Sequence, residues 1–341
     1  MKPVTVQKAI TIRDLARELA LSPATVSRAL NDEDSVKKQT KRRIFELAEK
    51  RGYRTNDFAR ILRNRRTNTI GVIVPRLNSH VMSAVIAGME KVASKEGYSL
   101  IIMQSHESKA TEAACANILF NKCVDGLMVS LSYETATLSH FNAFAQKDIP
   151  LILFDRVNSG NEFTHIFIDN YKAAYEITRH LLQQGRKRVV HITADTSLLV
   201  YTERAKGYRQ ALTEAGIPIK EGYMIKSDLT REGGAAIAAD ILQWKEMPDA
   251  IFAAGDNCAV GCIMALKAAG MDIPGDIAVA GFNNDPVSTV VEPGLTTINY
   301  PGYEMGEAAA QHLIYRLQGL APGNTVNTIL LRSDLVIRGS T

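Results

Sequence analysis

Seven apolar runs, separated by amphipathic segments, occupy the chain from Thr69 onward. Strands of a parallel sheet covered by helices on both faces read as nearly continuous apolar runs. We therefore expect an α/β fold built on parallel sheets, and so many runs suit two similar lobes better than one sheet. The runs are TIGVIVP, SLIIMQ, DGLMVSL, PLILFD, KRVVHIT, DAIFAAG and DIAVAGF.

Polar side chains directly follow several of these runs. Ligands of open parallel sheets bind at the carboxyl ends of the strands, so these side chains are candidates for a binding cleft. Carboxylates that accept and an arginine fork that donates suit the adjacent hydroxyls of a polyol. A helix cap is the alternative for each aspartate, and His80 is equally well explained as a loop residue. The candidates are Asn78, Ser79, His80, Asp155, Arg156, Asp169, Asp256 and Asn283, together with Arg204, which opens a helix.

The first 30 residues carry the signals of two short helices joined by a tight turn. Thr11 and Asp14 have the spacing of a capping box, and apolar residues then recur at helical spacing to a helix end near Ala20. Ser22 caps a second helix that has Pro23 at its first position. This pattern predicts a helix-turn-helix unit.

The second of these helices has a sparse outer face. We expect Val26 and Leu30 to pack against Leu15 and Leu19 of the first helix, and a third helix to follow over residues 38–51. The outer positions near the start of a recognition helix are those that reach base edges. They are Pro23, Ala24, Thr25, Ser27 and Arg28.

Charge is divided unevenly along the chain. Residues 1–66 contain 17 basic and 8 acidic side chains, a net charge of +9, whereas the rest contains 23 basic and 28 acidic side chains, a net charge of −5. A basic N-terminal head (residues 1–66) joined to a mildly acidic remainder indicates that the head binds a polyanion. The positive charge of the head and the sparse outer face of its second helix together favour DNA binding over a generic three-helix bundle.

Four blocks of the sequence resemble the LacI/GalR family of transcription regulators, from about residue 10 to the end. The resemblance implies a helix-turn-helix head followed by a two-lobed, periplasmic-binding-protein-like domain for effector binding and dimerisation. The chain departs from the family pattern at Thr55, where proline is common, and at Lys37 and Lys38, where serine or acidic residues are usual. The blocks are TIRDLARELALSPATVSRALND, ELAEKRGYRTN, ARILRNRRTNTIGVIVP and VAGFNNDPVSTVVEPGLTTIN.

The resemblance also implies domain boundaries. Residues 1–10 form an extension that need not be ordered, 11–55 the helix-turn-helix domain, 56–68 the hinge helix and linker, and 69–338 the effector-binding domain. The N-lobe is expected over about 69–163 and 296–324, and the C-lobe over about 164–295 and 325–338.

The hinge segment is NDFARILRNRR, residues 56–66. A helix this short is unstable in isolation, so disorder away from DNA is expected. By resemblance, two copies fold in the minor groove and Leu62 wedges into the central base step; a flexible basic tether is the alternative. The residues assigned to DNA contact are Thr11, Ser22, Pro23, Ala24, Thr25, Ser27, Arg28, Asn31, Tyr53, Asn56, Ala59, Arg60 and Leu62.

The resemblance strengthens some of the cleft candidates. Arg204, Asp155 and Asp256 match effector-contacting positions of the family, whereas Asn283 stands where many relatives have aspartate, which weakens one hydroxyl acceptor. The residues assigned to effector contact are Asn78, His80, Asp155, Arg156, Arg204, Asp256 and Asn283.

Several protein classes are disfavoured by what the sequence lacks. There is no G-x-G-x-x-G after the first strand, no P-loop, no G-x-S-x-G and no H-E-x-x-H, so no catalytic residue or cofactor is expected. Four cysteines without C-x-x-C spacing read as reduced thiols rather than a metal site. Without a signal peptide or an apolar stretch of membrane-spanning length, we expect a cytoplasmic protein with no membrane partner.

These observations predict an operator-binding transcription regulator, a repressor of carbohydrate-use genes. It would bind a pseudo-palindromic double-stranded DNA operator as a homodimer, switched by a sugar or sugar derivative between its lobes. The alternatives are a solute-binding protein without DNA regulation, a sugar-converting enzyme with a DNA-binding domain, and a regulator that answers to a nucleobase or another non-sugar ligand. Whether the effector releases or promotes DNA binding stays open at this point.

Overall fold

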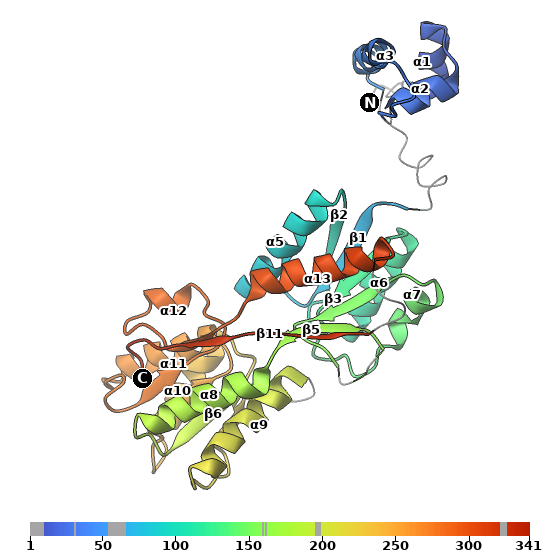
Figure 1. Cartoon of the computed structure of the whole chain (residues 1–341). Helices are drawn as coiled ribbons and strands as arrows, with labels where there is room; N and C mark the ends of the chain where they lie inside the picture. Colours follow the sequence, from blue (N-terminus) through green and yellow to red (C-terminus); the bar gives the residue numbers. More distant parts are fainter. Residues whose placement is uncertain are drawn as a thin grey trace, which may run out of the picture. The chain divides into compact units, whose positions relative to one another are not determined.

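The computed structural model describes residues 10–30, 32–53, 66–158, 160, 162–194, 199–320 and 326–341. The chain divides into two compact units, Met1–Arg66 and Thr67–Thr341 (Figure 1). The hinge residues Asn56, Ala59, Arg60 and Leu62, as well as Asn31, lie outside the described residues.

The small unit contains three helices around one apolar cluster. Thr11 closes a capping box with Asp14 at the start of α1, and Ala20 ends that helix in a left-handed conformation (φ 55°). The core contains Leu15, Val26 and also Ala29, while Leu19 and Leu30 pack at its edge. The helices are α1 (Ile12–Leu19), α2 (Pro23–Leu30) and α3 (Lys38–Lys50).

The first lobe of the large unit is a six-stranded sheet with parallel neighbours throughout, in the order β11-β5-β4-β3-β1-β2. Along β1, Ile70, Val72 and Val74 pack in the cluster of α5 and α13, whereas Ile73 packs in the cluster of α6 and α7. Both faces of the sheet are therefore covered, which explains the continuous apolar runs. The strands are β1 (Thr69–Val74), β2 (Ser99–Gln104), β3 (Gly126–Val129), β4 (Leu151–Phe154), β5 (Thr164–Ile168) and β11 (Thr328–Leu331).

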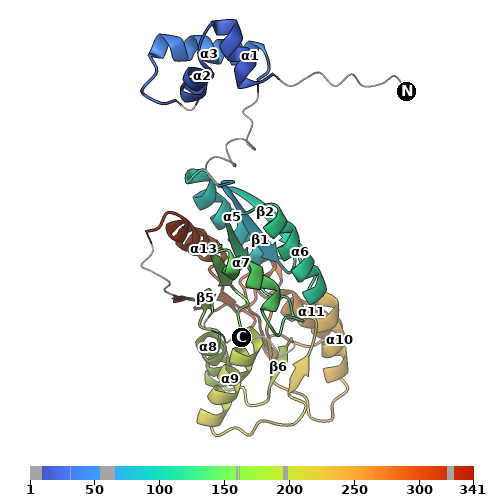
Figure 2. The ribbon, with the colours of Figure 1, turned by 90° about the vertical axis from the view of Figure 1, so that its right-hand side faces the viewer.

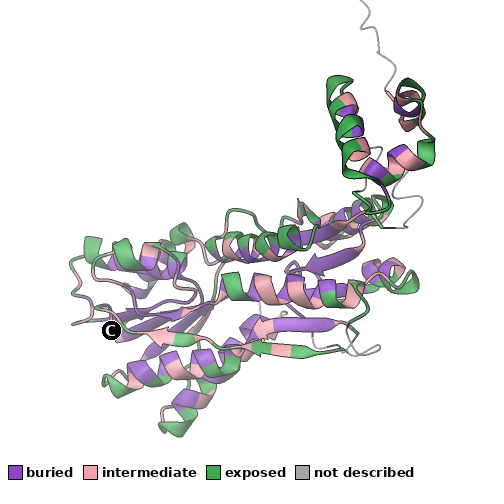
Figure 3. Cartoon of the chain, turned by 45° about the horizontal axis from the view of Figure 1, so that its top comes forward, coloured by how far each residue is buried: buried purple, intermediate pink, exposed green. Residues whose placement is uncertain are grey.

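The helices of this lobe leave polar faces to solvent and bury their inner faces against the strands (Figure 3). Helices α5 and α13 run side by side (Figure 1). Two glycines permit this close approach because they have no Cβ. A Cβ on Gly88 would clash with the Tyr303 carbonyl, and a Cβ on Gly306 would clash with the Val85 carbonyl. The helical segments are α5 (His80–Lys95), α6 (Lys109–Asn121), η1 (Ser139–Phe141), α7 (Asn142–Gln146) and α13 (Gly302–Leu317).

The second lobe is a four-stranded parallel sheet in the order β7-β6-β8-β9. In Figure 2, β6 lies between α8 and α9 on one side and α10 and α11 on the other. Val189 of β6 packs in the cluster that includes residues of α8 and α9, and Val190 in that of α10 and α11. A two-stranded antiparallel ladder joins β10 to β12. The elements are β6 (Val189–Thr193), β7 (Met224–Lys226), β8 (Ala250–Ala253), β9 (Ala278–Ala280), β10 (Thr297–Asn299), β12 (Asp334–Val336), α8 (Asn170–Gln183), α9 (Leu199–Glu214), α10 (Arg231–Ile241), α11 (Asp256–Ala268) and α12 (Val287–Val290).

The expected α/β class is confirmed, and each of the seven apolar runs contains a strand: β1, β2, β3, β4, β6, β8 and β9. The lobe boundaries differ from the expected ones. Strands β5 and β11 were assigned to the C-lobe, but they pair with each other and with β4 in the first-lobe sheet. β11 is the edge strand of this sheet, and β5 lies between β11 and β4. This pairing, which periodicity does not encode, moves the crossings to after Ile168 and after Leu331.

His191 is completely buried in the second-lobe sheet. Its ring stacks between those of Tyr208 and Phe252, and Nδ1–H donates to the Phe252 carbonyl (3.0 Å). Its Nε2 has no partner among the described residues. Burial therefore lowers the pKa of His191 to about 4.

This lowered pKa predicts a loss of stability on the acid side. The unfolded chain takes up a proton at His191 near its ordinary pKa of 6.5, but the folded chain does not until about pH 4. The contribution of neutral His191 to the free energy of unfolding is therefore fully present above about pH 6.5. At roughly pH 5 it is about 2 kcal/mol smaller. Urea unfolding of wild type and His191→Phe at about pH 7.5 and pH 5 measures this difference. Equal acid losses in both proteins would contradict it.

Candidate functional site

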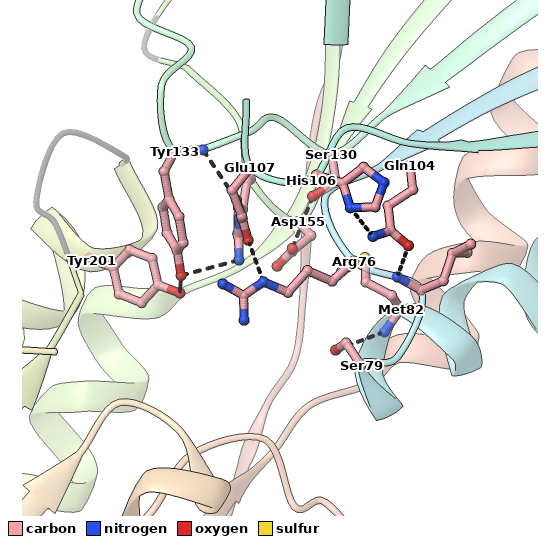
Figure 4. Close-up of polar contacts among 12 residues, drawn as sticks. Arg76, Ser79, Met82, Gln104, His106, Glu107, Ser130, Tyr133, Asp155 and Tyr201 are labelled. Carbon is pink, nitrogen blue, oxygen red and sulfur yellow. Dashed lines mark hydrogen bonds and ion pairs between the residues drawn. The ribbon is translucent and has the colours of Figure 1, made fainter. Parts of the chain in front are cut away.

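A cavity of about 510 Å³ lies between the two lobes of the large unit. Its walls come from segments that follow β1, β2, β3 and β4 in the first lobe and β7, β8 and β9 in the second, with additions from α9 and Tyr300. The lobes touch across it through the hydroxyls of Tyr133 and Tyr201, which are 3.0 Å apart and point toward one another (Figure 4). Parallel pairing thus brings residues distant in sequence to one cleft.

All seven residues assigned to effector contact line this cavity: Asn78, His80, Asp155, Arg156, Arg204, Asp256 and Asn283. Ser79 lines it as well, and its hydroxyl caps α5. Asp169 does not. It caps α8 through the Lys172 backbone N–H (2.9 Å) and lines a smaller cavity of about 210 Å³.

Asp155 and Arg204 are held firmly before any ligand arrives. Ser130 Oγ (3.1 Å) and the Tyr300 hydroxyl (2.6 Å) donate to the two oxygens of the Asp155 carboxylate. Arg204 donates from Nε to Asn170 Oδ1 (2.9 Å) and from Nη1 to the Ala254 carbonyl (3.0 Å). Its guanidinium also stacks on the Phe282 ring at 3.6 Å. Arg204 Nη2 makes no hydrogen bond to the described residues, so it is the donor left for a ligand.

Asp256 lies in the cavity wall, but its carboxylate is used internally. One oxygen accepts from the Thr297 hydroxyl (2.6 Å) and the other from the Asp285 backbone N–H (2.7 Å). Burial raises the pKa of Asp256 to about 7, against the lowering effect of Thr297. This arrangement lets Asp256 support the 282–285 loop from the cavity wall.

Asp285, two residues beyond Asn283, supplies a carboxylate that sequence reasoning missed. Its Oδ2 receives a long hydrogen bond from Asn257 (3.4 Å), while Oδ1 is buried without a hydrogen-bond partner in the described part of the chain. Burial raises the pKa of Asp285, and His80 and Asn283 act in the opposite direction. An unsatisfied buried acceptor is costly to a folded protein and is typical of a functional site.

Four residues of the cavity wall hold left-handed backbone conformations although none is glycine. Their φ angles are 62° at Glu107, 56° at Asp155, 59° at Leu229 and 117° at Asn283. Such conformations cost free energy in non-glycine residues and cluster at functional sites. The cavity wall therefore contains four positions with an energetically costly backbone conformation.

Other charged and aromatic wall residues were also missed. Glu107 follows β2 and Tyr133 follows β3, so the strand-end rule would have found both had it been applied to every apolar run. Asp228 follows β7, a strand that the apolar runs did not reveal. Arg231 begins α10, and Tyr300 follows β10, a strand that the apolar runs did not reveal. The missed residues are Arg76, Glu107, Tyr133, Tyr201, Asp228, Arg231, Glu232, Asp285 and Tyr300.

The second candidate site is the surface of α2. Ser22 caps the helix through the Thr25 backbone N–H (3.1 Å), and its hydroxyl contacts that of Thr25 (2.8 Å). Ser22, Pro23, Ala24 and Arg28 are exposed. Ser27 and Thr25 are half-buried, and Arg28 Nε donates a long hydrogen bond to the Ala24 carbonyl of the same helix (3.4 Å).

The remaining described residues assigned to DNA contact are less available. The Thr11 hydroxyl donates to Asp14 Oδ2 (2.7 Å), and Tyr53 packs against the apolar cluster of the head.

Comparison with known proteins identifies the chain. Residues 11–56 match the model of bacterial regulatory proteins of the lacI family, and residues 67–328 match that of periplasmic binding proteins and the sugar-binding domain of the LacI family. The protein belongs to the LacI family. It is therefore a DNA-binding transcription regulator with a ligand-binding domain, and the enzyme and solute-binding alternatives are excluded.

LacI-family relatives match nearly the whole chain. Catabolite control protein A of Priestia megaterium is 32% identical over 89% of this chain and 91% of its own length. The transcriptional repressor CytR of Escherichia coli K12 is 30% identical over 100% of this chain and 99% of its own. Among solved structures, the Lac repressor dimer bound to operator shares the fold with a TM-score of 0.87 at 23% identity, covering 98% of this chain and 99% of that one.

No helix in the described ranges is long and apolar enough to span a membrane. Within the same ranges, no group of three or more His, Cys, Asp or Glu side chains is arranged to hold a metal ion.

The exposed Arg28 predicts a loss of sequence discrimination on mutation. Arg28→Ala should weaken binding to an operator fragment, selected from random duplex DNA, by about 1–3 kcal/mol and relax preference at one base pair. Fluorescence anisotropy on selected and random duplexes measures both affinities. Arg51→Ala is the control, because Arg51 already pairs with Glu18 (2.8 Å). Equal loss on both duplexes would show that Arg28 contacts only phosphate.

Proposed function

We propose that this protein is a repressor whose operator binding is switched by an uncharged sugar or sugar derivative in the interlobe cavity. The observation that carries the proposal is the charge inventory of the cavity wall. Its four arginines, at positions 76, 156, 204 and 231, are all engaged by protein acceptors, and six acidic residues surround them.

Such a wall disfavours an anionic ligand and favours one rich in hydroxyl groups. The acceptor Asp285 Oδ1 and the donor Arg204 Nη2 together suit a hydroxyl-bearing compound, because a hydroxyl both donates and accepts. The transcriptional regulator CelR, whose complex with cellobiose has the same fold at 24% identity, provides an example of this ligand class.

The switch itself follows from the placement of the groups on different lobes. Asp155 belongs to the first lobe and Arg204 to the second, so a ligand bridging them has different affinities for open and closed lobes. Such differential affinity is the only means by which a ligand shifts a conformational equilibrium. We further propose that the regulator acts as a homodimer on a pseudo-palindromic operator, because one head reads too short a half-site.

The experiment is an effector titration of the complex with selected operator DNA. Anisotropy is followed as D-ribose, D-galactose, cellobiose, cytidine or hypoxanthine is added. A change in anisotropy with one or more of the three sugars, and with neither cytidine nor hypoxanthine, supports the proposal. A response confined to cytidine or hypoxanthine would replace the sugar by a nucleoside or nucleobase, and a response to none would remove the sugar assignment. Light scattering of the free protein tests the dimer, which a stable monomer unchanged by operator would contradict.

Arg204 provides the sharpest variant. Arg204→Ala should abolish the response to the compound that acts on wild type, because a forked donor that lysine cannot imitate is lost. Operator affinity without that compound should stay near wild type, because the head is untouched. Arg209→Ala, an exposed arginine of the same helix, is the control and should respond normally. A persisting response in Arg204→Ala, with an unchanged melting temperature, would leave Arg204 no role in the switch.

A further inference from the structure

Glu107 lies between two arginines of the cavity wall, each from a different strand end. It follows β2 in a left-handed conformation (φ 62°), Arg76 follows β1, and Arg156 follows β4. In Figure 4 the Glu107 carboxylate lies beside the Arg76 guanidinium at the centre of the polar network. All three belong to the first lobe, so their arrangement does not depend on lobe closure.

The carboxylate uses both oxygens in this position. Oε1 forms an ion pair with Arg76 Nε at 3.4 Å but has no hydrogen-bond partner among the described residues. Oε2 accepts from Arg156 Nη1 at 2.7 Å and from the Tyr133 backbone N–H at 3.3 Å. Arg156 is further fixed by stacking on the Tyr133 ring at 4.3 Å. Glu107 and Arg156 are 13% and 14% exposed, which shields their pairing from water.

Two guanidinium groups that face one pair of oxygens form an anion site. Arginine forks bind carboxylate and phosphate oxygens in the same manner, so a ligand phosphate or carboxylate would fit where the Glu107 carboxylate lies. We propose that Glu107 determines the charge specificity of the cavity: it occupies this two-arginine site and thereby excludes phosphorylated and carboxylated ligands. The inference rests on the proposed role of the cavity in binding the effector.

Removal of Glu107 should expose the site rather than collapse it. The neighbouring Asp155 is engaged elsewhere, because its two oxygens accept from Ser130 and Tyr300. Asp228 accepts two hydrogen bonds from Thr230 on Oδ1 (2.8 and 3.0 Å). Asp155 is therefore not free to replace Glu107. Two guanidinium groups would then lack a partner, and a dissolved anion could take the vacated place.

The test is a gain of phosphate binding by Glu107→Gly, which removes the carboxylate and suits the left-handed backbone. In about 10 mM inorganic phosphate, the melting temperature of this variant should rise by about 2–5 °C relative to sodium chloride of equal ionic strength. Wild type in the same buffers should show no such rise. An equal rise in wild type, or none in the variant, would overturn the inference.

Three further variants make the result specific. Glu107→Gly combined with Arg156→Gln should lose the gain, and persistence of the rise would refute the assigned site. Glu232→Gln, which neutralises a cavity carboxylate whose pair with Arg231 is exposed, should gain nothing. If Glu107→Gly does not fold, Glu107→Gln is measured instead, and a rise no larger than that of wild type would count against the proposal. Because the probe is phosphate, these outcomes are independent of whether any sugar acts on the operator complex.

Discussion

Parallel strand pairing is the constraint on which the ligand-binding unit depends. In each lobe it places every strand's carboxyl end at the same edge, so the short segments after β1, β2, β3 and β4 meet those after β7, β8 and β9. Helices on both faces make this possible by removing the sheets from water, and the glycine contacts between α5 and α13 let that covering layer pack closely. The cavity is a consequence of topology, and its chemistry depends on a few residues per strand end.

Most charged groups of the cavity wall form hydrogen bonds or ion pairs with other protein groups, and this limits which ligands the cavity can bind. Asp155, Arg204 and Asp256 each form hydrogen bonds with other protein groups, and these bonds fix the positions of their side chains. Rigid, paired charges cost little to desolvate further and orient the few groups that remain unpaired. Specificity would therefore come from a small remainder, such as Asp285 Oδ1, rather than from the full set of charged side chains.

Contacts between protein groups in the cleft also couple the two lobes. The hydroxyl contact between Tyr133 and Tyr201 spans it, and the hydroxyl of Tyr300, just beyond β10, reaches Asp155 of the first lobe. A ligand must replace or join these contacts to change the preferred separation of the lobes. The free energy available for switching is the difference between the two sets of contacts, not the total binding energy.

The sequence by itself determined the α/β class, the three head helices, and seven cavity residues, because apolar periodicity and strand-end position are local properties. It placed β5 and β11 in the wrong lobe, because the partner of a strand depends on which backbone hydrogen-bonding groups are open in the assembled sheet. It could not show that the Asp256 carboxylate, which lines the cavity as expected, also accepts hydrogen bonds from Thr297 and from the Asp285 backbone. Only the tertiary structure decided which polar groups pair internally, as Glu107 does with Arg76 and Arg156, because those partners come from strands far apart in the chain.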